Sequence, residues 1–512
     1  MAKHFLELKD LPIAPIEKPL RVLVLADDRQ QQHAVSDHIS AIIDGSQHQM
    51  NLVNPIYDSP SDLDQLENYD ALLIHYSIYI IGPYYLSAEW VDFVVQFDGL
   101  KIQIIQDEYR EIEKMKVQMR FLGVRILVSC LPLSAAEQVY FGEFMSNIDV
   151  YAGCLPGYFS KRLIEKPKIP ISDRGLDVIY RGRELPWSAG LHAREKSDIA
   201  YLFSDWVSDA DLNMDLETLE TKRLAGDQWD EFLMTGKAMI ATEGGISIFD
   251  FDGTIHSNFA AFQEANPDGD FFRYWQDNLE QYEGNVIHKT ITPKIFEAIA
   301  LKTALVLFPG EWSGILEPER HFIVLERDGS NIADVISKLE DDTFLTELVD
   351  RTFAEVAERD DLSFATYVNG IDNLLMAKLA KDGTGNVEMA FQSRLSSTNV
   401  ELDRTIEELR DVKVQLTDVR FELDKSNQLL EMAEGKIEHE KQKAEQLLIM
   451  GKATAFAERD AAFAERDAAF AERDAAFAER DAAFAERDTK PLVVARSILK
   501  KIYSKLRKKR HN

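Results

Sequence analysis

Cysteine is almost absent from this chain of 512 residues, which contains only Cys130 and Cys154. Two cysteines are too few for a disulfide scaffold, and their spacing is not that of a metal site, so we expect a reducing, cytoplasmic compartment. No apolar run approaches the ~20 residues of a membrane-spanning helix, and the first residues lack an apolar segment of signal-peptide length. Any contact with a membrane is therefore expected to be peripheral.

Positive charge is also scarce, since the formal net charge is −30 at pH 7. So large a negative charge argues against general nucleic-acid binding, although the last segment of the chain has the opposite sign. A glycine-rich phosphate-binding loop is missing as well, and we expect neither a metal nor a bound cofactor. The apolar fraction of 45% suits a soluble protein, and the length suits two or three domains with substantial cores.

Strands alternate with helices in the first part of the chain. Continuous apolar runs predict four buried strands: Arg21–Ala26, Ala71–Ser77, Lys101–Gln106 and Arg125–Cys130. A helix is predicted at Leu86–Gln96, and this alternation indicates a parallel, doubly wound sheet. His75, Asp107 and Glu108 lie at the ends of two of these strands. Because ligands bind at the carboxyl ends of such strands, we expect the three side chains to open onto one crevice.

A second α/β pattern follows a proline-rich crossing at Cys154–Arg174. Its predicted strands and helices are, in chain order, Val178–Arg181, Asp227–Leu233, Ala238–Thr242, Lys294–Lys302, Ala304–Phe308 and His321–Leu325. A polar loop, Gly182–Lys196, is predicted after the first of these strands, and the chain becomes apolar again at Ile199–Phe203.

Four cations would lie beside the predicted cleft: Arg181, Arg183, Arg194 and Lys196. Together they can neutralise a diphosphate, because arginine forks and the lysine point charge both bind phosphate. For any single cation, an ion pair with Glu184 or Glu195 is an equally good interpretation as a contact with phosphate.

The stretch Thr292–His321 predicts a helix, a buried strand and a loop in succession. Thr292 can cap the helix, and Pro293 suits its first position. Glu297 falls in the first turns, and its side chain leans toward the helix N-terminus, where free backbone amides attract phosphate. Glu311 lies in the loop after the strand, at the edge where open α/β sheets bind ligands.

From residue 386 the chain changes character. Leucine recurs every seven residues from Leu395 to Leu430, which predicts a coiled coil over 386–450. Five copies of the unit FAERD follow over 451–488 and predict a helical spacer. The segment 489–512 has nine Lys or Arg residues and no acid. Such a basic amphipathic helix is typical of an anchor on anionic lipid, the alternative being packing on the protein's own acidic surface.

The motif IFDFDGT at Ile248–Thr254 resembles the first motif of haloacid dehalogenase-like phosphatases. In that interpretation an apolar strand leads to Asp250 as the nucleophile, and Asp252 is the general acid. The resemblance covers this motif alone, so a phosphatase is a minor alternative.

A wider resemblance runs through residues 20–380. The segments that carry it include HYS at 75–77, FDGLKIQIIQDEYR at 97–110, YRGRELP at 180–186, GLHAREK at 190–196, EGGISIFDFDG at 243–253 and TPKIFEAIALKTALVLFPGEWSGILEPERH at 292–321. Together they resemble bacterial glycosyltransferases of the GT-B type, more narrowly the CgeB-like or group 1 glycosyltransferases of surface-polysaccharide clusters. The resemblance implies two Rossmann-like domains facing a cleft. It also implies metal-independent transfer of a sugar from a nucleotide-linked donor to a glycan acceptor.

The resemblance further implies roles on the donor side. The donor-binding residues would be Arg183, Lys196, Glu243, Asp250, Glu297 and Glu311. Arg183 and Lys196 would stabilise the leaving diphosphate, and Glu297 would bind the donor ribose as the second glutamate of the family's paired motif. Lys289 stands where the first glutamate would fall, so that part of the donor contact departs from the family.

On the acceptor side, the resemblance implies that His75, Asp107 and Glu108 face the donor and act in catalysis. His75 would bind the transferring sugar or transfer a proton, since an imidazole titrates near neutrality. A histidine that merely satisfies backbone groups at a strand end is the alternative.

The expected domains are 1–165 on the acceptor side and 166–385 on the donor side, followed by the coiled coil, the spacer and the tail. The main hypothesis is a homo-oligomeric glycosyltransferase held at the inner face of the cell membrane by residues 489–512. A second hypothesis is a catalytically weak GT-B-like scaffold or length-control protein, because the coil and tail form a large part of the chain.

Overall fold

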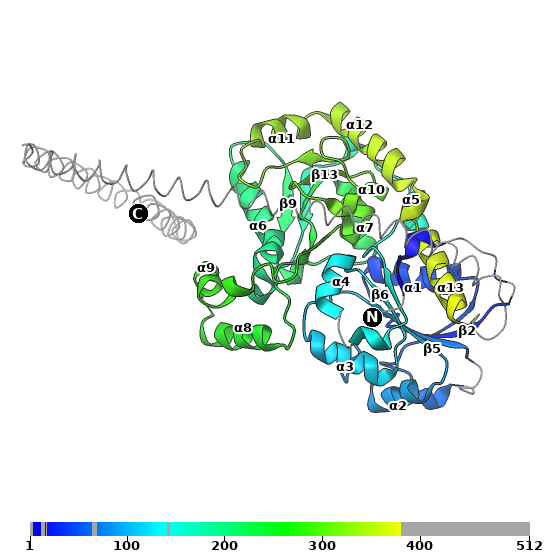
Figure 1. Cartoon of the computed structure of the whole chain (residues 1–512). Coiled ribbons are helices and arrows are strands. Elements are labelled where there is room, and N and C mark those ends of the chain that lie inside the picture. Colours follow the sequence, from blue (N-terminus) through cyan, green and yellow to red (C-terminus); the bar gives the residue numbers. More distant parts are fainter. Residues whose placement is uncertain are drawn as a thin grey trace, which may run out of the picture. The chain divides into compact units, whose positions relative to one another are not determined.

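The computed structural model describes residues 4–11, 16, 18–63, 69–140, 144–267 and 269–379. All of them belong to the compact unit Met1–Ser393. The predicted coiled coil (386–450), spacer (451–488) and basic tail (489–512) lie outside the described residues. The described part contains two parallel sheets with helices on their faces (Figure 1), which confirms the predicted α/β fold with two Rossmann-like domains. None of its helices is long and apolar enough to cross a membrane.

Seven parallel strands form the first sheet, in the order β1-β7-β6-β5-β4-β2-β3. They are β1 (His4–Glu7), β2 (Arg21–Leu25), β3 (Gln49–Val53), β4 (Ala71–Ile74), β5 (Leu100–Ile105), β6 (Ile126–Ser129) and β7 (Val150–Gly153). The four predicted strands are β2, β4, β5 and β6. They are buried almost throughout, which is why they form continuous apolar runs in the sequence. The other three strands are short or partly polar and have no such run.

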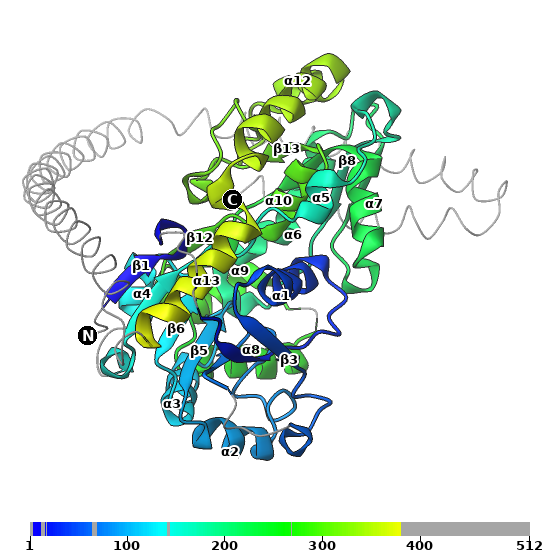
Figure 2. The ribbon, with the colours of Figure 1, turned by 90° about the vertical axis from the view of Figure 1, so that its right-hand side faces the viewer.

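Helices cover both faces of the first sheet: α1 (His33–Gly45), α2 (Ala88–Gln96), α3 (Ile112–Leu122), α4 (Leu133–Tyr140) and α13 (Phe364–Leu379). One face packs on α2, α3 and α4 through residues such as Trp90 and Met119. The other face packs on α1 and α13, where Ile39 and Ile371 lie against the strands. Figure 2 shows α13 beside α1. The range 166–385 thus includes a helix, α13, that packs on the first sheet.

Five parallel strands form the second sheet, in the order β14-β13-β10-β8-β9. They are β8 (Leu176–Arg181), β9 (Met214–Glu217), β10 (Gly236–Ala241), β13 (Ala304–Leu307) and β14 (Ile323–Val324). The accompanying helices are α6 (Gly190–Trp206), α7 (Asp227–Thr235), α10 (Pro293–Ala300), α11 (Ile332–Leu339) and α12 (Asp342–Thr352). The sheet core is formed by the buried residues of β8, β10 and β13.

The predicted polar loop Gly182–Lys196 is wrong in its second half, because α6 begins at Gly190. The helix continues through Ile199–Phe203, where the apolar side chains are buried at helical spacing. Gly190 has a φ of +87°, and a Cβ there would meet Ser247 Oγ at 2.4 Å, so this helix start requires glycine. A glycine followed by polar residues resembles a loop in sequence, which explains the error.

Helix α10 follows the prediction more closely. Pro293 occupies its first turn, and Ile295, Phe296 and Ile299 are buried as expected. Thr292 precedes the helix, but its side chain makes no capping hydrogen bond, contrary to the prediction.

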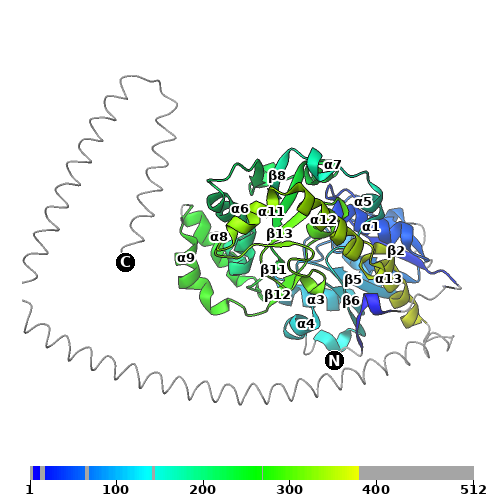
Figure 3. The same cartoon turned by 90° about the horizontal axis from the view of Figure 1, so that it is seen from above.

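A hairpin of β11 (Gly244–Ile246) and β12 (His288–Thr290) lies between the two sheets (Figure 3). The chain between its strands forms an insertion with α8 (Thr254–Ala265) and α9 (Phe271–Tyr274). This insertion has a small, largely aromatic core, which Trp187 from the loop before α6 completes, and it lies to one side of the sheets (Figure 1).

The domains meet through backbone and ionic contacts. The Asp250 N–H donates to the Tyr109 carbonyl at 2.8 Å, and the Glu113 N–H donates to the Phe251 carbonyl at 2.9 Å. A second set of contacts joins α1 to α7, where His33 Nδ1 lies 3.3 Å from Asp230. The short helix α5 (Lys161–Glu165) in the crossing contributes Arg162, which pairs with Asp230 and with Asp37 of α1.

Candidate active site

Two adjoining cavities lie among the loops that follow the strands of the two sheets. The first cavity, of about 390 Å³, is lined mainly by residues that follow β4 and β5. The second cavity, of about 440 Å³, is lined mainly by the loop after β8 and by residues of the insertion. Tyr109, Arg110 and Arg183 line both cavities and mark the junction between them. Open α/β sheets bind their ligands at this edge, so the junction is the candidate site.

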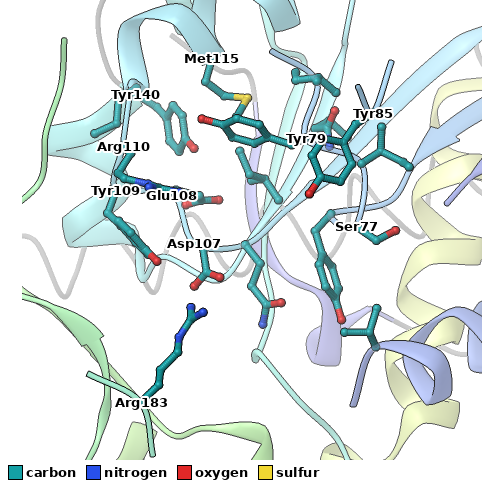
Figure 4. A pocket seen from close by; sticks show the side chains of 18 residues that line it. Ser77, Tyr79, Tyr85, Asp107, Glu108, Tyr109, Arg110, Met115, Tyr140 and Arg183 are labelled. Carbon is teal, nitrogen blue, oxygen red and sulfur yellow. The ribbon is translucent and has the colours of Figure 1, made fainter. Parts of the chain in front are cut away.

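Asp107 lies at the mouth of the first cavity, directly after β5. Its carboxylate is exposed, and Figure 4 shows it facing Arg183 of the second domain. The backbone of Asp107 has a φ of +59°, in the left-handed region. Such strain in a residue other than glycine concentrates at functional sites, and here it turns the carboxylate toward the opposite domain.

Glu108 lies in the wall of the same cavity and is only 8% exposed. The Ser129 hydroxyl accepts from the Leu131 N–H, so it donates its own proton to Glu108 Oε2 at 2.9 Å. Among the described residues, Glu108 Oε1 has no hydrogen-bond partner. Burial raises the pKa of the Glu108 carboxyl to about 8, although the Ser129 and Tyr140 hydroxyls lower it.

His75 lies apart from both cavities and is fully buried. Its Nδ1 accepts from the Ser77 N–H at 3.1 Å, so the proton resides on Nε2 and is donated to His38 Nδ1 at 2.9 Å. Burial, and then the neighbouring His38, hold the pKa of His75 well below its usual range. This environment suits the alternative role of a buried histidine that satisfies groups at a strand end.

The four cations predicted beside the cleft divide into two pairs. Arg181 forms two bonds of 2.8 Å to the Asp215 carboxylate, and Arg194 bonds Asp198 at 2.9 Å. Within the described chain, neither Arg183 nor Lys196 has a carboxylate partner. The Lys196 ammonium donates to the Gly245 carbonyl at 3.1 Å. Burial lowers the pKa of Lys196 to about 8, against the attraction of Asp107.

Two further cations belong to this region. Lys294, in the first turn of α10, donates to the Arg181 carbonyl at 2.5 Å, and burial lowers its pKa to about 8. Proximity to Lys196 lowers that pKa further. The sequence carried a signal for Lys294, because a cation at a helix N-terminus opposes the helix dipole and needs another reason to be there. Arg110 lies at the junction of the cavities without an ion pair among the described residues.

Glu297 lies on α10 and is 8% exposed, outside the lining of both cavities. The Trp229 indole N–H donates to Glu297 Oε2 at 2.7 Å. Burial raises the pKa of the Glu297 carboxyl to about 7, and the Trp229 bond and Lys294 lower it. Glu297 and Lys294 attract each other electrostatically without forming an ion pair in the described structure, and Glu297 lines neither cavity.

Glu243 and Glu311 lie on the loops after β10 and β13. Glu243 is buried and accepts from the Trp312 N–H at 2.8 Å, while Gly310 packs against its carboxylate. Glu243 thus holds the 310–312 loop in place. Glu311 is exposed and lines neither cavity.

Asp250 lines the second cavity, but its carboxylate is occupied. Its Oδ1 accepts from the Gly253 N–H at 2.9 Å and its Oδ2 from the His256 N–H at 2.8 Å, so Asp250 caps the start of α8. Asp252 also accepts from the Thr254 N–H, at 2.9 Å. No strand of the described structure leads into Asp250, since β11 ends at Ile246. The predicted apolar strand of the phosphatase motif is therefore wrong, and the Asp-rich motif forms a helix start.

One group of His and Asp side chains has the spacing of cation ligands: His33, Asp227 and Asp230. Asp230 is already neutralised, because Arg162 and Lys166 both pair with it. Cations at this place would repel a metal ion, so we interpret the group as an ionic contact between α1, α5 and α7.

No protein-family model matches the chain, and no curated protein sequence matches it. Solved structures of similar arrangement include the T4 phage beta-glucosyltransferase, at a TM-score of 0.39 and 11% identity over 71% of this chain and 99% of that one. An alpha-glucosyltransferase in complex with UDP-glucose and DNA containing an abasic site aligns with a TM-score of 0.45 and 9% sequence identity. The alignment covers 70% of this chain and 100% of that one. TarM aligns with a TM-score of 0.34 and 12% sequence identity, and the alignment covers 60% of this chain and 54% of that one.

Proposed function

We propose that this chain is a glycosyltransferase that moves a sugar from a nucleoside diphosphate donor to an acceptor hydroxyl. The observation that supports it is the junction of the two cavities. There an exposed carboxylate, Asp107, faces the guanidinium of Arg183, which has no carboxylate partner among the described residues (Figure 4). The ammonium groups of Lys196 and Lys294 line neither cavity, but both are close enough to Arg183 to interact with it electrostatically. A direct displacement at the anomeric carbon uses this combination, a base for the acceptor and fixed positive charge for the leaving diphosphate.

In the proposed reaction Asp107 accepts the proton of the acceptor hydroxyl. The acceptor oxygen forms a bond to the anomeric carbon while the bond from that carbon to the diphosphate oxygen breaks. The electron pair leaves with the diphosphate, whose charge Arg183, Lys196 and Lys294 stabilise. Charges placed in advance need no rearrangement during the reaction, which is the main source of their effect.

Nucleotide binding tests the proposal. A panel of nucleoside diphosphates, measured by thermal shift, should contain at least one that raises the melting temperature of the full chain, because a ligand of the folded state stabilises it by mass action. The matching nucleotide sugars should then release nucleotide in the presence of acceptor. Lys294→Met should weaken this binding, whereas Arg194→Gln, which removes a cation that is already paired, should not. Absence of any nucleotide effect would contradict the proposal and favour the scaffold hypothesis.

We further propose a glycan of the cell surface as the acceptor, oligomerisation through 386–450 and attachment to anionic membrane through 489–512. The sequence patterns of these segments support the last two points. Co-sedimentation with vesicles of phosphatidylserine and phosphatidylcholine tests the attachment, and deletion of 489–512 should abolish it. Unchanged sedimentation of the deletion variant would exclude this role of the tail.

A further inference from the structure

The first cavity has an unusual lining for a site next to a cationic junction. Five tyrosines contribute to it: Tyr76, Tyr79, Tyr85, Tyr109 and Tyr140. The rest of the lining is mixed, with isoleucines, Val35 and Met115 as apolar members and Ser77, Gln103, Gln106, Asp107 and Glu108 as polar ones. Among the described residues that line it there is no lysine or histidine, and its two arginines, Arg110 and Arg183, are those shared with the second cavity. The interior therefore combines apolar side chains with hydroxyl, amide and carboxyl groups, and the cations lie at one end.

Glu108 and Gln103 are the polar groups of this interior that have unused bonding capacity, because Oε1 of each is buried without a partner among the described residues. In Glu108, Ser129 occupies Oε2, and Oε1 forms no hydrogen bond in the described structure, although the Tyr140 hydroxyl is near enough to lower the pKa of the carboxyl. Figure 4 shows the carboxyl in the cavity wall beside Tyr140. Burial keeps the carboxyl protonated at neutral pH, since its pKa is raised to about 8. Burying a polar atom without a hydrogen-bond partner costs free energy. A ligand that forms a hydrogen bond to Oε1 removes this cost, which favours its binding.

We propose that the first cavity binds the acceptor as an uncharged, hydroxyl-bearing ring, a sugar residue or cyclic polyol, with Glu108 hydrogen-bonded to one of its hydroxyls. This inference rests on the proposed function, because it names the acceptor class of that transfer. Tyrosines offer such a ring both apolar faces and hydroxyl partners. The ring lies next to Asp107 at the mouth, where the reacting hydroxyl meets the donor.

Charged ligands fit the interior less well. An anionic ring would lose its hydration without meeting a cation beyond the junction, and burial of an unpaired charge is costly. A cation could lie against tyrosine faces, which attract positive charge, and is therefore the rival that an experiment must exclude. Glu108 distinguishes the two, because a protonated carboxyl bonds a hydroxyl but does not neutralise a cation.

Ligand binding without donor tests the inference. The full chain at pH 7 is titrated with methyl hexosides and inositol, with a hexose phosphate and a hexuronate, and with choline, by calorimetry or ligand-observed NMR. The neutral rings should bind at least about tenfold more tightly than the anions and choline. Glu108→Ala should weaken the neutral rings about tenfold, Glu108→Gln should stay within about threefold, and Glu184→Gln, an exposed carboxyl of the second cavity, should change nothing.

Equal or tighter binding of an anion or of choline would overturn the inference, as would unchanged binding by Glu108→Ala. Thermal unfolding confirms that the variants are folded, and Glu108→Gln keeps the test valid if Glu108→Ala does not fold. The two proposals fail separately. Neutral rings that bind to a chain without nucleotide affinity would refute the proposed transfer, whereas nucleotide binding and transfer to a charged acceptor would refute only this inference.

Discussion

The two sides of the crevice differ in how their charges are matched. On the second-domain side, Arg183, Lys196 and Lys294 have no carboxylate partner among the described residues. On the first-domain side, Glu108 is a buried carboxyl without a cation, in a cavity lined by tyrosines, isoleucines and the amides of Gln103 and Gln106. Elsewhere the same residue types are paired, as in the contact of Arg181 with Asp215 at 2.8 Å. Arg174 and Lys168 lie outside the crevice and also lack a carboxylate, but they bond backbone carbonyls, whereas Arg183 has no hydrogen bond among the described residues.

This contrast indicates a division of work. Unpaired ammonium groups that are partly desolvated favour an anion strongly, because the protein has already borne part of the cost of removing their water. A protonated carboxyl among tyrosines favours an uncharged, hydroxyl-bearing ligand instead. Asp107 lies between these environments, at the one place where a neutral acceptor and an anionic donor would meet.

Of the substitutions considered, Asp107→Asn should have the largest effect, because Asp107 lies where the acceptor side and the donor side of the crevice meet. The amide has the same shape but cannot accept the proton, so the rate of transfer should fall by about 10²- to 10⁴-fold. Nucleotide affinity should stay within about threefold, because no donor contact is removed. Rates with saturating donor and acceptor, and nucleotide titrations, measure the two quantities. Asp252→Asn, which removes an exposed carboxylate of the insertion, is the control. A fully active Asp107→Asn enzyme would exclude Asp107 as the base.

The affinity for nucleoside diphosphate should depend on pH through the two lysines. Lys196 and Lys294 have pKa values lowered to about 8, and only their protonated forms attract the diphosphate. Affinity should therefore be highest below pH 8 and fall as the pH rises through that value, where an ordinary lysine with a pKa near 10.4 would still be charged. Lys294→Met should lower affinity about tenfold at pH 7 and make the decrease with pH shallower. Calorimetric titration between pH 6.5 and 9.5 measures both effects, and a flat profile would contradict the role of these lysines.

The sequence predicted the scaffold of this crevice better than its chemistry. Strands such as β4 and β5 are buried on both faces, so their apolar runs identify them without tertiary information. Asp107 and Glu108 follow from the same logic, because the end of a strand fixes where they lie. The pairing of Arg181 with Asp215, 34 residues away, depends on the neighbouring strand β9, which no apolar run indicates. Which cations remain free is therefore decided by tertiary contacts.

Two further outcomes have local causes: the phosphatase alternative at Asp250, and the cavity tyrosines that were not singled out from the sequence. Asp250 belongs to a motif shared by phosphatases and by capped helix starts, and only the missing strand and the backbone amides on its carboxylate distinguish them. The tyrosines of the first cavity lie in a visibly tyrosine-rich stretch from Tyr76 to Tyr85, which was the available signal. Because Tyr109 and Tyr140 come from other loops, the cavity itself appears only in the fold.

Glu108 should make the stability of the protein depend on pH on the first-domain side. Its pKa is raised to about 8 in the folded state, above its value in the unfolded chain, so folding favours the protonated form. The stabilising contribution of that proton is complete below about pH 4 and is lost as the pH rises through 8. Glu108→Gln cannot ionise, so above pH 8 it should be more stable than the wild type by about 1–3 kcal/mol, relative to their difference at pH 4. Urea unfolding at pH 4, 7 and 9 measures this difference, and a constant difference would show that Glu108 is not held neutral.

Asp250→Asn gives the smallest expected effect and tests whether the second-domain side is free of unmatched negative charge. The Asp250 carboxylate accepts two backbone amides at the start of α8, so its charge is already offset. Asparagine keeps one acceptor oxygen, and the free energy of unfolding should fall by about 0.5–2 kcal/mol. Thermal unfolding measures this loss of stability. Asp252→Asn is the comparison, because Asp252 also accepts a backbone N–H at the start of α8 but is exposed to solvent. An unchanged stability would mean that the carboxylate is available to a ligand, and loss of a magnesium-dependent phosphatase activity would revive the phosphatase interpretation. A loss of stability alone would leave the unpaired cations as the feature that defines this side of the crevice.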